Sequence, residues 1–372
     1  MSATETSISI PAELLPEDGR FGSGPSKVRQ EALTSFLDIA PRYLGTSHRQ
    51  NEVKREVARL QNGLSELFSL PQDWEILLGN GGSTLFWDAA SFNLIDSKSQ
   101  HLSFGEFSSK FATVVQKAPH LEEPEIISSV PGTCPAAVPS NVDAYALTHN
   151  ETSTGVTATL NRPSKDALTL VDATSAAGAI NWDPDQVDCY YFAPQKALAS
   201  DGGLWLAACS PAAIGRIEKL SGGERWTPAG LDLGIALSNS RQNQTYNTPS
   251  LATIFLAAEM VEWINASGGL SWADERCRRS SNTIYEWASD RTFAEPFVNQ
   301  ISDRSPVVCT IDFEDVDAGA ISRVLRANGI VDTESYRKLG RNQIRVATFP
   351  AVEPSDVDAL CACLDFVVEA LS

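Results

Sequence analysis

Long hydrophobic runs and basic residues are both scarce in this chain. No stretch reaches the roughly 20 apolar residues that a transmembrane helix requires, and residues 1–20 lack the basic start and apolar middle of a signal peptide. The 29 lysines and arginines are outnumbered by 47 acidic residues, which gives a net charge of −18. Such a surface disfavours binding to nucleic acid or anionic membranes. We therefore expect a cytoplasmic protein with neither partner, whose residues 1–20 form a polar arm.

Cysteine pairing and metal binding are not indicated by the sequence. The seven cysteines are scattered, and none belongs to a C-x-x-C pair. Cys361 and Cys363 fall in a predicted helix, where positions i and i+2 point apart. No group of His, Cys and Asp residues has the spacing of a metal site. We expect reduced thiols, most of them with packing roles, and no bound metal.

Apolar runs that alternate with helical patterns predict an α/β fold. The length of 372 residues and the apolar content of 42% suit two domains. Runs that are apolar nearly throughout are typical of a mostly parallel sheet that helices cover on both faces. Helices are expected after the first strand, ending at Asn93, and over 106–117. The strands expected in this region are 74–78, 125–128, 145–147, 168–173, 189–193 and 204–209.

A shorter α/β arrangement is expected in the C-terminal part. It follows a long helix over Pro249–Asn265, which would hold its proline in the first turn. The expected elements are helices over 270–289, 317–328 and 355–371 and strands over 306–313 and 343–348. We predict an arm over 1–20, a large domain over 21–265 and a small domain over 266–372.

Asp172 and Lys196 form the most informative residue pair. Asp172 ends one apolar run, and Lys196 follows the next, just before a Gly-Gly turn. A pyridoxal phosphate enzyme needs such a pair: a lysine that forms a Schiff base with the cofactor aldehyde, and a carboxylate that keeps the pyridine nitrogen protonated. The alternative is a strand cap and a solvated loop lysine.

Other candidate residues also fall at predicted strand ends, where ligands bind in open α/β sheets. The segment from Gly79 to Thr84 joins a strand to a helix, so its N–H groups can bind a phosphate, or it is a tight turn with Ser83 as the helix cap. Phe107 can stack on a planar ring or belong to the core. Asn247-Thr248-Pro249 opens the long helix and is expected to cap it.

Two basic clusters stand out against the acidic background. Ser47-His48-Arg49 precedes a predicted helix, and Tyr336–Arg341 leads to Arg345 in a predicted strand. Arginine binds carboxylates and phosphates through two parallel hydrogen bonds. Surface ion pairs are the alternative for Arg49 and Arg345.

These motifs, in this order, resemble those of the phosphoserine aminotransferases, fold-type I pyridoxal phosphate enzymes of the class V aminotransferase group. The resemblance covers nearly the whole chain and implies a large domain with a mostly parallel sheet plus a smaller C-terminal α/β domain. The matching motifs are Gly24-Pro25, Ser47-His48-Arg49, Asn150-Glu151-Thr152, Asp172-Ala173-Thr174-Ser175, Pro194-Gln195-Lys196 and Asn247-Thr248-Pro249.

The resemblance implies a role for each cofactor-binding residue. Lys196 would form the Schiff base with pyridoxal 5′-phosphate and carry the proton, and Asp172 would pair with the pyridine nitrogen. Phe107 would stack on the ring, and Thr152 would bind near the ring hydroxyl. The residues that would hold the cofactor phosphate are Ser83, Thr84 and Gln195.

The resemblance also implies a homodimer with shared sites and a phosphorylated substrate. Asn247 and Thr248 would reach the cofactor phosphate of the neighbouring subunit. Arg345 would bind the substrate α-carboxylate, and His48 and Arg49 its phosphate.

Two departures from the family pattern affect the phosphate contacts. Many relatives have Gly-Gly-Arg-Gly-Gln-Phe where this chain has Gly-Gly-Ser-Thr-Leu-Phe, so the cofactor phosphate loses an arginine. Many also have His-Arg where this chain has Lys338-Leu339. Arg337, Lys338 or Arg341 can substitute, and the sequence leaves that choice open.

The implied reaction is reversible transamination between L-glutamate and 3-phosphohydroxypyruvate, which gives 2-oxoglutarate and O-phospho-L-serine for serine biosynthesis. Whether 4-phosphohydroxythreonine, a vitamin B6 precursor, also reacts stays open. The alternatives are an alanine- or serine-glyoxylate type aminotransferase, a cysteine desulfurase, or a cofactor-binding regulatory module. A desulfurase needs a mobile, exposed cysteine, but Cys309, Cys361 and Cys363 fall in predicted regular elements.

Overall fold

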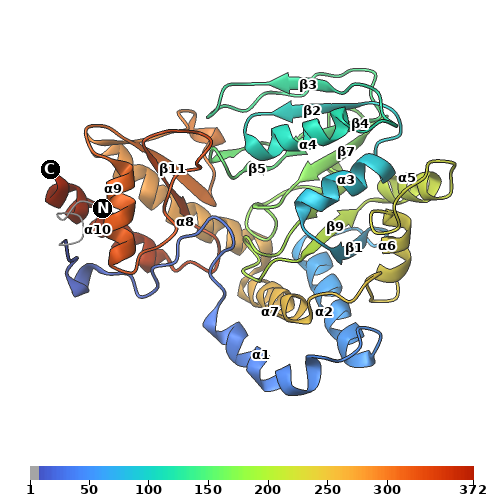
Figure 1. The fold of residues 1–372 in the computed structure, drawn as a ribbon, viewed down its shortest axis with the longest axis horizontal. Helices are drawn as coiled ribbons and strands as arrows, with labels where there is room; N and C mark the ends of the chain where they lie inside the picture. Colours follow the sequence, from blue (N-terminus) through green and yellow to red (C-terminus); the bar gives the residue numbers. More distant parts are fainter. Residues whose placement is uncertain (1–7) are drawn as a thin grey trace.

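A seven-stranded sheet lies at the centre of the larger part of the molecule, in a computed structural model that describes residues 8–372 (Figure 1). Neighbouring strands are parallel except that β9 runs antiparallel to both β1 and β8. The mostly parallel sheet that the apolar runs predict is thus confirmed. The strand order is β1 (Glu75–Asn80), β9 (Leu204–Cys209), β8 (Cys189–Phe192), β7 (Leu168–Asp172), β4 (Ala144–Thr148), β2 (Ser99–Ser103) and β3 (Glu125–Ser128).

Helices cover both faces of this sheet. Successive residues of a strand point to opposite faces, so Ile76 and Leu78 belong to one hydrophobic cluster and Leu77 to another. The first cluster includes α2 (Asn51–Leu67) and α7 (Leu251–Ser267). The second includes α3 (Ser83–Asn93), α4 (Glu106–Gln116), α5 (Pro211–Ser221) and α6 (Leu233–Ser240).

A three-stranded antiparallel sheet forms the other end of the molecule (Figure 1). Residues from the N-terminal segment pack on the same core: Ile10 is buried there, and its N–H donates to Asn328 Oδ1 over 2.9 Å. Residues 1–7 of the predicted arm lie outside the described part. The elements here are β10 (Ala294–Pro296), β11 (Val308–Phe313), β12 (Gln343–Ala347), α8 (Gly269–Ser289), α9 (Ala318–Ala327) and α10 (Pro354–Leu371).

Helix α8 contributes to the cores of both parts. Its first half places Leu270 and Cys277 in the larger core, and its second half places Ile284 and Trp287 in the smaller one. Because one helix serves both cores, the domain boundary after residue 265 stays a prediction. Within residues 8–372, no helix is both long enough and apolar enough to cross a membrane.

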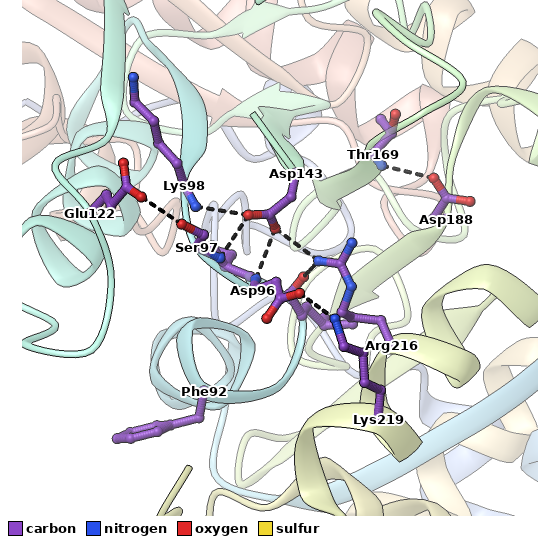
Figure 2. A network of polar contacts seen from close by, with 12 residues as sticks. Phe92, Asp96, Ser97, Lys98, Glu122, Asp143, Thr169, Asp188, Arg216 and Lys219 are labelled. Carbon is purple, nitrogen blue, oxygen red and sulfur yellow. Dashed lines mark hydrogen bonds and ion pairs between the residues drawn. The ribbon is translucent and has the colours of Figure 1, made fainter. Parts of the chain in front are cut away.

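Asp143, just before β4, fixes the connection between α3 and β2 (Figure 2). Its carboxylate accepts hydrogen bonds from the backbone N–H groups of Asp96, Ser97 and Lys98 at 2.7–2.8 Å. Arg216 of α5 donates to the same carboxylate over 2.8 Å. This loop therefore stays ordered at the amino end of the sheet, opposite the strand ends that carry the candidate residues.

The start of α7 and the strand β2 differ from the sequence prediction. The helix α7 begins at Leu251, and Ser250 caps it by accepting a hydrogen bond from Thr253 N. The expectations that Pro249 lies in the first turn and that Asn247-Thr248-Pro249 caps the helix are therefore wrong. Strand β2 was not predicted, because Ser99, Gln100 and His101 are polar although they are buried. Hydrogen bonds compensate for that burial: Ser99 Oγ lies 2.9 Å from His101 Nε2. Within residues 8–372, the remaining α-helix is α1 (Gln30–Tyr43), the remaining strands are the short pair β5 (Asn150–Glu151) and β6 (Val156–Thr157), and the short 3-10 helices are η2 (Ala12–Leu14), η3 (Pro184–Gln186) and η4 (Ile301–Asp303).

Candidate active site

A cavity of about 170 Å³ lies at the carboxyl ends of β4, β7 and β8. Parallel strands end at the same edge of a sheet, which is why residues distant in sequence meet there. All the residues predicted to bind the cofactor line the cavity except Asn247 and Thr248. The lining residues are Gly82, Ser83, Thr84, Trp87, Phe107, Thr148, Asn150, Thr152, Asp172, Thr174, Gln195 and Lys196.

Lys196 follows β8 and lies against the segment around Gly24. Its Nζ donates to the carbonyl oxygen of Ser23 over 2.7 Å. A Cβ on Gly24, whose φ is +124°, would lie 2.1 Å from this Nζ, so only glycine permits the approach. The pKa of Lys196 is lowered to about 8, mainly by desolvation and also by the charge of Arg345, while the charge of Asp172 partly opposes the fall. A substantial fraction of the amine is therefore neutral near pH 8 and can accept a proton.

Asp172 ends β7 and is buried in the cavity wall. Trp87 Nε1 donates to Oδ2 over 3.0 Å, and the N–H and hydroxyl of Thr174 donate to Oδ1 over 2.9 and 2.5 Å. Burial raises the pKa of Asp172, and these hydrogen bonds partly oppose the rise. A positively charged group in the cavity would stabilise the ionised carboxylate.

The start of α3 forms the end of the cavity suited to an anion. Gly82 is the N-cap and Ser83 the first helical residue, so the alternative in which Ser83 caps the helix is wrong. The first N–H groups of a helix have no intrahelical acceptor. Ser83 Oγ and Gln195 Oε1 are buried without a hydrogen-bond partner in the described residues. The Ser83 hydroxyl and the free N–H groups of this helix start can donate to an anionic, oxygen-rich group.

Phe107, Asn150 and Thr152 form a further part of the cavity wall. The ring of Phe107, in the first turn of α4, lines the cavity. Thr152 Oγ1 and Asn150 Nδ2 both donate to Ser175 Oγ over 2.9 Å, while Asn150 Oδ1 is buried without a partner among residues 8–372. The cavity as a whole therefore fits a flat, polar aromatic ring that carries a positive charge and a phosphate.

Arg345, in strand β12 of the small sheet, contacts the cavity wall. It donates through Nη1 to the carbonyl oxygen of Thr152 over 3.1 Å, and its guanidinium carbon lies 5.4 Å from the ring centroid of Tyr336. Its Nε is buried without a partner in the part of the chain that the structure describes. Burial lowers the pKa of Arg345. An arginine with an unused donor beside the cavity can bind a carboxylate.

Five predicted residues do not line this cavity. Arg345 is one of them and contacts its wall through Thr152 O, and the other four are His48, Arg49, Asn247 and Thr248. His48 Nδ1 lies 3.1 Å from Thr248 Oγ1, and Asn80 Nδ2 donates to Thr248 O over 3.0 Å. His48 Nε2 is buried without a partner in the described chain, and burial lowers the pKa of His48. The four residues form a separate group beside the β1–α3 turn.

Trp87 and Thr174 are site residues that sequence reasoning missed. A tryptophan in a helix resembles a core residue, but Trp87 lies three positions after Thr84, on the same helix face as a predicted phosphate ligand. That spacing was the available signal. Thr174 lies two positions after Asp172, where the backbone N–H commonly donates to a preceding aspartate side chain.

The cysteines offer no exposed nucleophile. Cys134 is half-buried and the other six are buried. Burial raises the pKa of Cys134, and that of Cys309, to about 12. Thiols in such surroundings stay protonated and unreactive. Among residues 8–372, no three His, Cys, Asp or Glu side chains are grouped so that they could hold a metal ion.

Comparison with known proteins gives a consistent result. The family described as Aminotransferase class-V matches residues 115–333. A Mycobacterium leprae protein assigned provisionally to the phosphoserine aminotransferases is 56% identical over 369 residues, 98% of each chain. The phosphoserine aminotransferase of Rhodococcus jostii is 52% identical over 372 residues, which covers 99% of this chain and 100% of that protein.

Solved structures show the same fold. The crystal structure of a phosphoserine aminotransferase from Cytophaga hutchinsonii has a TM-score of 0.86 and 22% sequence identity, and it covers 94% of this chain and 99% of that one. The predicted α/β architecture of a large and a small sheet is therefore confirmed as the fold-type I arrangement.

Proposed function

The chain belongs to the class-V aminotransferase family and, within it, to the phosphoserine aminotransferases, and on that premise we propose the reaction that it catalyses. It transfers the amino group of L-glutamate to 3-phosphohydroxypyruvate, which gives 2-oxoglutarate and O-phospho-L-serine in L-serine biosynthesis. The cofactor is pyridoxal 5′-phosphate. The observation that carries the proposal is a single cavity that unites Lys196, with its lowered pKa, and the buried carboxylate of Asp172.

The cavity residues fit this cofactor at both ends. When bound, pyridoxal phosphate supplies an aldehyde carbon and an electron-accepting ring. The carboxylate of Asp172 would accept the ring N–H, which offsets the cost of its burial. Phe107 would cover one face of the ring. Ser83 Oγ would donate to the phosphate and so gain the partner that it lacks, and Gln195 would donate to the same group through its amide Nε2.

Lys196 would move the proton during transamination. Only the neutral amine accepts a proton, and the lowered pKa of about 8 makes this form available near neutral pH. The substrate Cα–H bond must be held within reach of Nζ. Arg345, beside Thr152, would fix the α-carboxylate and so set that orientation.

A homodimer would complete the site with the group that lies outside the cavity. His48, Arg49, Asn247 and Thr248 are proposed to reach the neighbouring subunit's site, where they would bind the phosphates of the substrate and the cofactor. Exposed apolar side chains occur next to these segments in sequence: Leu44 is 47% and Tyr246 46% exposed.

Two of the three basic candidates for additional substrate-phosphate binding, Arg341 and Lys338, have different ion-pair partners. Arg341 is bound through Nε and Nη2 to Asp312, with Nε–Oδ2 at 2.9 Å, and lies over Phe297. Lys338 instead pairs with Glu106 over 2.5 Å, one residue from Phe107. Because Lys338 lies closer to Phe107 and so to the cavity, we favour Lys338 over Arg341 for this role.

We also propose that the enzyme is cytoplasmic.

Steady-state kinetics with matched acceptors test the proposed substrate. L-Glutamate is the donor, and the acceptors are 3-phosphohydroxypyruvate, its unphosphorylated analogue hydroxypyruvate, and glyoxylate. We expect the phosphorylated acceptor to have the highest kcat/KM by at least two orders of magnitude, because charge-assisted hydrogen bonds to its phosphate each contribute about 1.5–3 kcal/mol. A higher kcat/KM for glyoxylate would favour the glyoxylate-type aminotransferases instead.

A further inference from the structure

Glu151 is a fully buried carboxylate that the proposed reaction does not use. It lies between Asn150 and Thr152, which both line the cavity, and its side chain points away toward the start of α4. The donors to its carboxylate belong to Phe107 and Ser108 in the first turn of α4 and to Ser153 in its own loop. The hydrogen bonds that its oxygens accept come from Phe107 N (3.1 Å), Ser108 N (2.9 Å), Ser108 Oγ (2.9 Å), Ser153 N (3.2 Å) and Ser153 Oγ (2.6 Å).

These bonds make Glu151 the cap of α4. The residue in the N-cap position is Gly105, which has no side chain to bind the free N–H groups of the first turn. A Cβ on Gly105 would lie 2.3 Å from Glu151 Cγ, so the absence of that atom makes room for the glutamate. A negative charge is also favoured at a helix N-terminus.

The same contacts connect two parts of the cavity wall, the start of α4 with Phe107 and the segment with Asn150 and Thr152. Through Glu151, the backbone of Phe107 is fixed to the segment that carries Thr152. Ser153 Oγ reinforces the joint by accepting from Glu106 N over 3.0 Å. Arg345 donates a hydrogen bond to Thr152 O, so the same segment also contacts the proposed carboxylate-binding arginine.

A catalytic or ring-binding role for Glu151 does not fit the geometry. Among residues 8–372, the hydrogen-bond donors to its carboxylate come from α4 and from Ser153 of its own loop, so both oxygens are occupied away from the cavity. Its charge raises the pKa of Asp172, which opposes ionisation of the proposed ring partner. Its charge also raises the pKa of Arg345, but Glu151 forms its hydrogen bonds with α4 and Ser153.

We propose that Glu151 is a positioning residue, whose carboxylate fixes the first turn of α4 and thereby holds the Phe107 ring against the cofactor. This inference rests on the proposed function, because it assumes that pyridoxal phosphate occupies the cavity. It predicts that removing the charge weakens cofactor binding through Phe107.

Cofactor titration of the apoenzyme tests the inference without relying on activity. The dissociation constant of pyridoxal phosphate is measured by tryptophan fluorescence for the wild type and for Glu151→Gln, whose amide keeps the size but turns a donor toward N–H groups. We expect binding to weaken about tenfold or more, as for the loss of one hydrogen bond to a charged group. The matched control is Asp232→Asn, since Asp232 caps α6 through Gly234 N and Ile235 N away from the cavity; its cofactor affinity should stay at the wild-type value.

A double-mutant cycle shows whether the effect passes through Phe107. In a Phe107→Ala background, Glu151→Gln should change the dissociation constant less than twofold. If Glu151→Gln does not fold, Ser153→Ala removes the 2.6 Å bond and should weaken binding about threefold. Wild-type affinity in Glu151→Gln or Ser153→Ala, equal weakening in Asp232→Asn, or an undiminished effect in the Phe107→Ala background would overturn the inference. Failure of the wild type to bind the cofactor would instead overturn the proposed function.

Discussion

The hydrogen bond from Trp87 to Asp172 should control how cofactor affinity depends on pH. The substitution Trp87→Phe removes the indole N–H, which donates to Oδ2 over 3.0 Å, and keeps an aromatic ring near Phe111. That hydrogen bond lowers the pKa of Asp172, which burial raises. Without it, the pKa of the free protein's carboxyl rises further, so protonation persists to higher pH.

The magnitude follows from the difference between charged and neutral hydrogen bonds. A bond to an ionised group contributes about 1.5–3 kcal/mol, and one to a neutral group about 0.5–1.5 kcal/mol. Below the pKa of Asp172, the free protein loses only the weaker bond, whereas the complex with its ionised carboxylate loses the stronger one. The difference of about 1 kcal/mol corresponds to roughly fivefold weaker binding. Above that pKa, both states lose the same bond and the effect disappears.

The assay is the dissociation constant of pyridoxal phosphate for the apoenzyme, measured across a pH series and expressed as the ratio of variant to wild type. Titration of the cofactor itself cancels in this ratio. Trp205→Phe is the control for lost packing, because Trp205 is a buried tryptophan of the same core that does not line the cavity. A ratio that is independent of pH, or an equal ratio for Trp205→Phe, would refute the reasoning.

Three further substitutions test separate parts of the account. Lys196→Met should raise the thermal midpoint of the apoenzyme at pH 7, because a protonated lysine whose folded pKa of about 8 lies below its unfolded pKa destabilises the folded state. This gain in the midpoint should shrink as the pH rises from 8 toward 10.5, and a gain that grows with pH would contradict the account. Gly24→Ala should abolish activity and cofactor-dependent absorbance, because the new Cβ would lie 2.1 Å from Lys196 Nζ, whereas the circular dichroism of the protein should stay unchanged. Wild-type activity in this variant would show that the lysine lies elsewhere. Arg49→Ala should raise KM for 3-phosphohydroxypyruvate at least tenfold more than KM for L-glutamate, because the loss of a charge-assisted bond affects mainly the phosphate; equal changes would mean that Arg49 does not select the phosphate.

The cavity could be foreseen because its residues follow strands. Asp172 and Lys196 end apolar runs, and a mostly parallel sheet must bring such ends together. Ser83 and Thr84 were found for the same reason, although the cap of α3 proved to be Gly82. Local spacing could not show this last detail, since either residue can precede a helix.

The contacts that depend on tertiary burial could not be foreseen. Strand β2 reads as polar, and only its hydrogen bonds within the fold allow Gln100 and His101 to be buried. Glu151 reads as part of a polar turn, and its partners at Phe107 and Ser108 lie 43–44 positions away in sequence. His48 and Arg49 lie outside the cavity of their own chain, a placement that no pattern within one chain can reveal.

The two half-reactions, followed by the absorbance of the bound cofactor, test the central claim most directly. Addition of L-glutamate alone to the purified holoenzyme should convert the visible band of the bound cofactor, and subsequent 3-phosphohydroxypyruvate should restore it, with O-phospho-L-serine formed in equal amount. Lys196→Ala should show neither change. A wild-type band that does not respond to either compound, or that is restored by glyoxylate but not by 3-phosphohydroxypyruvate, would contradict the account.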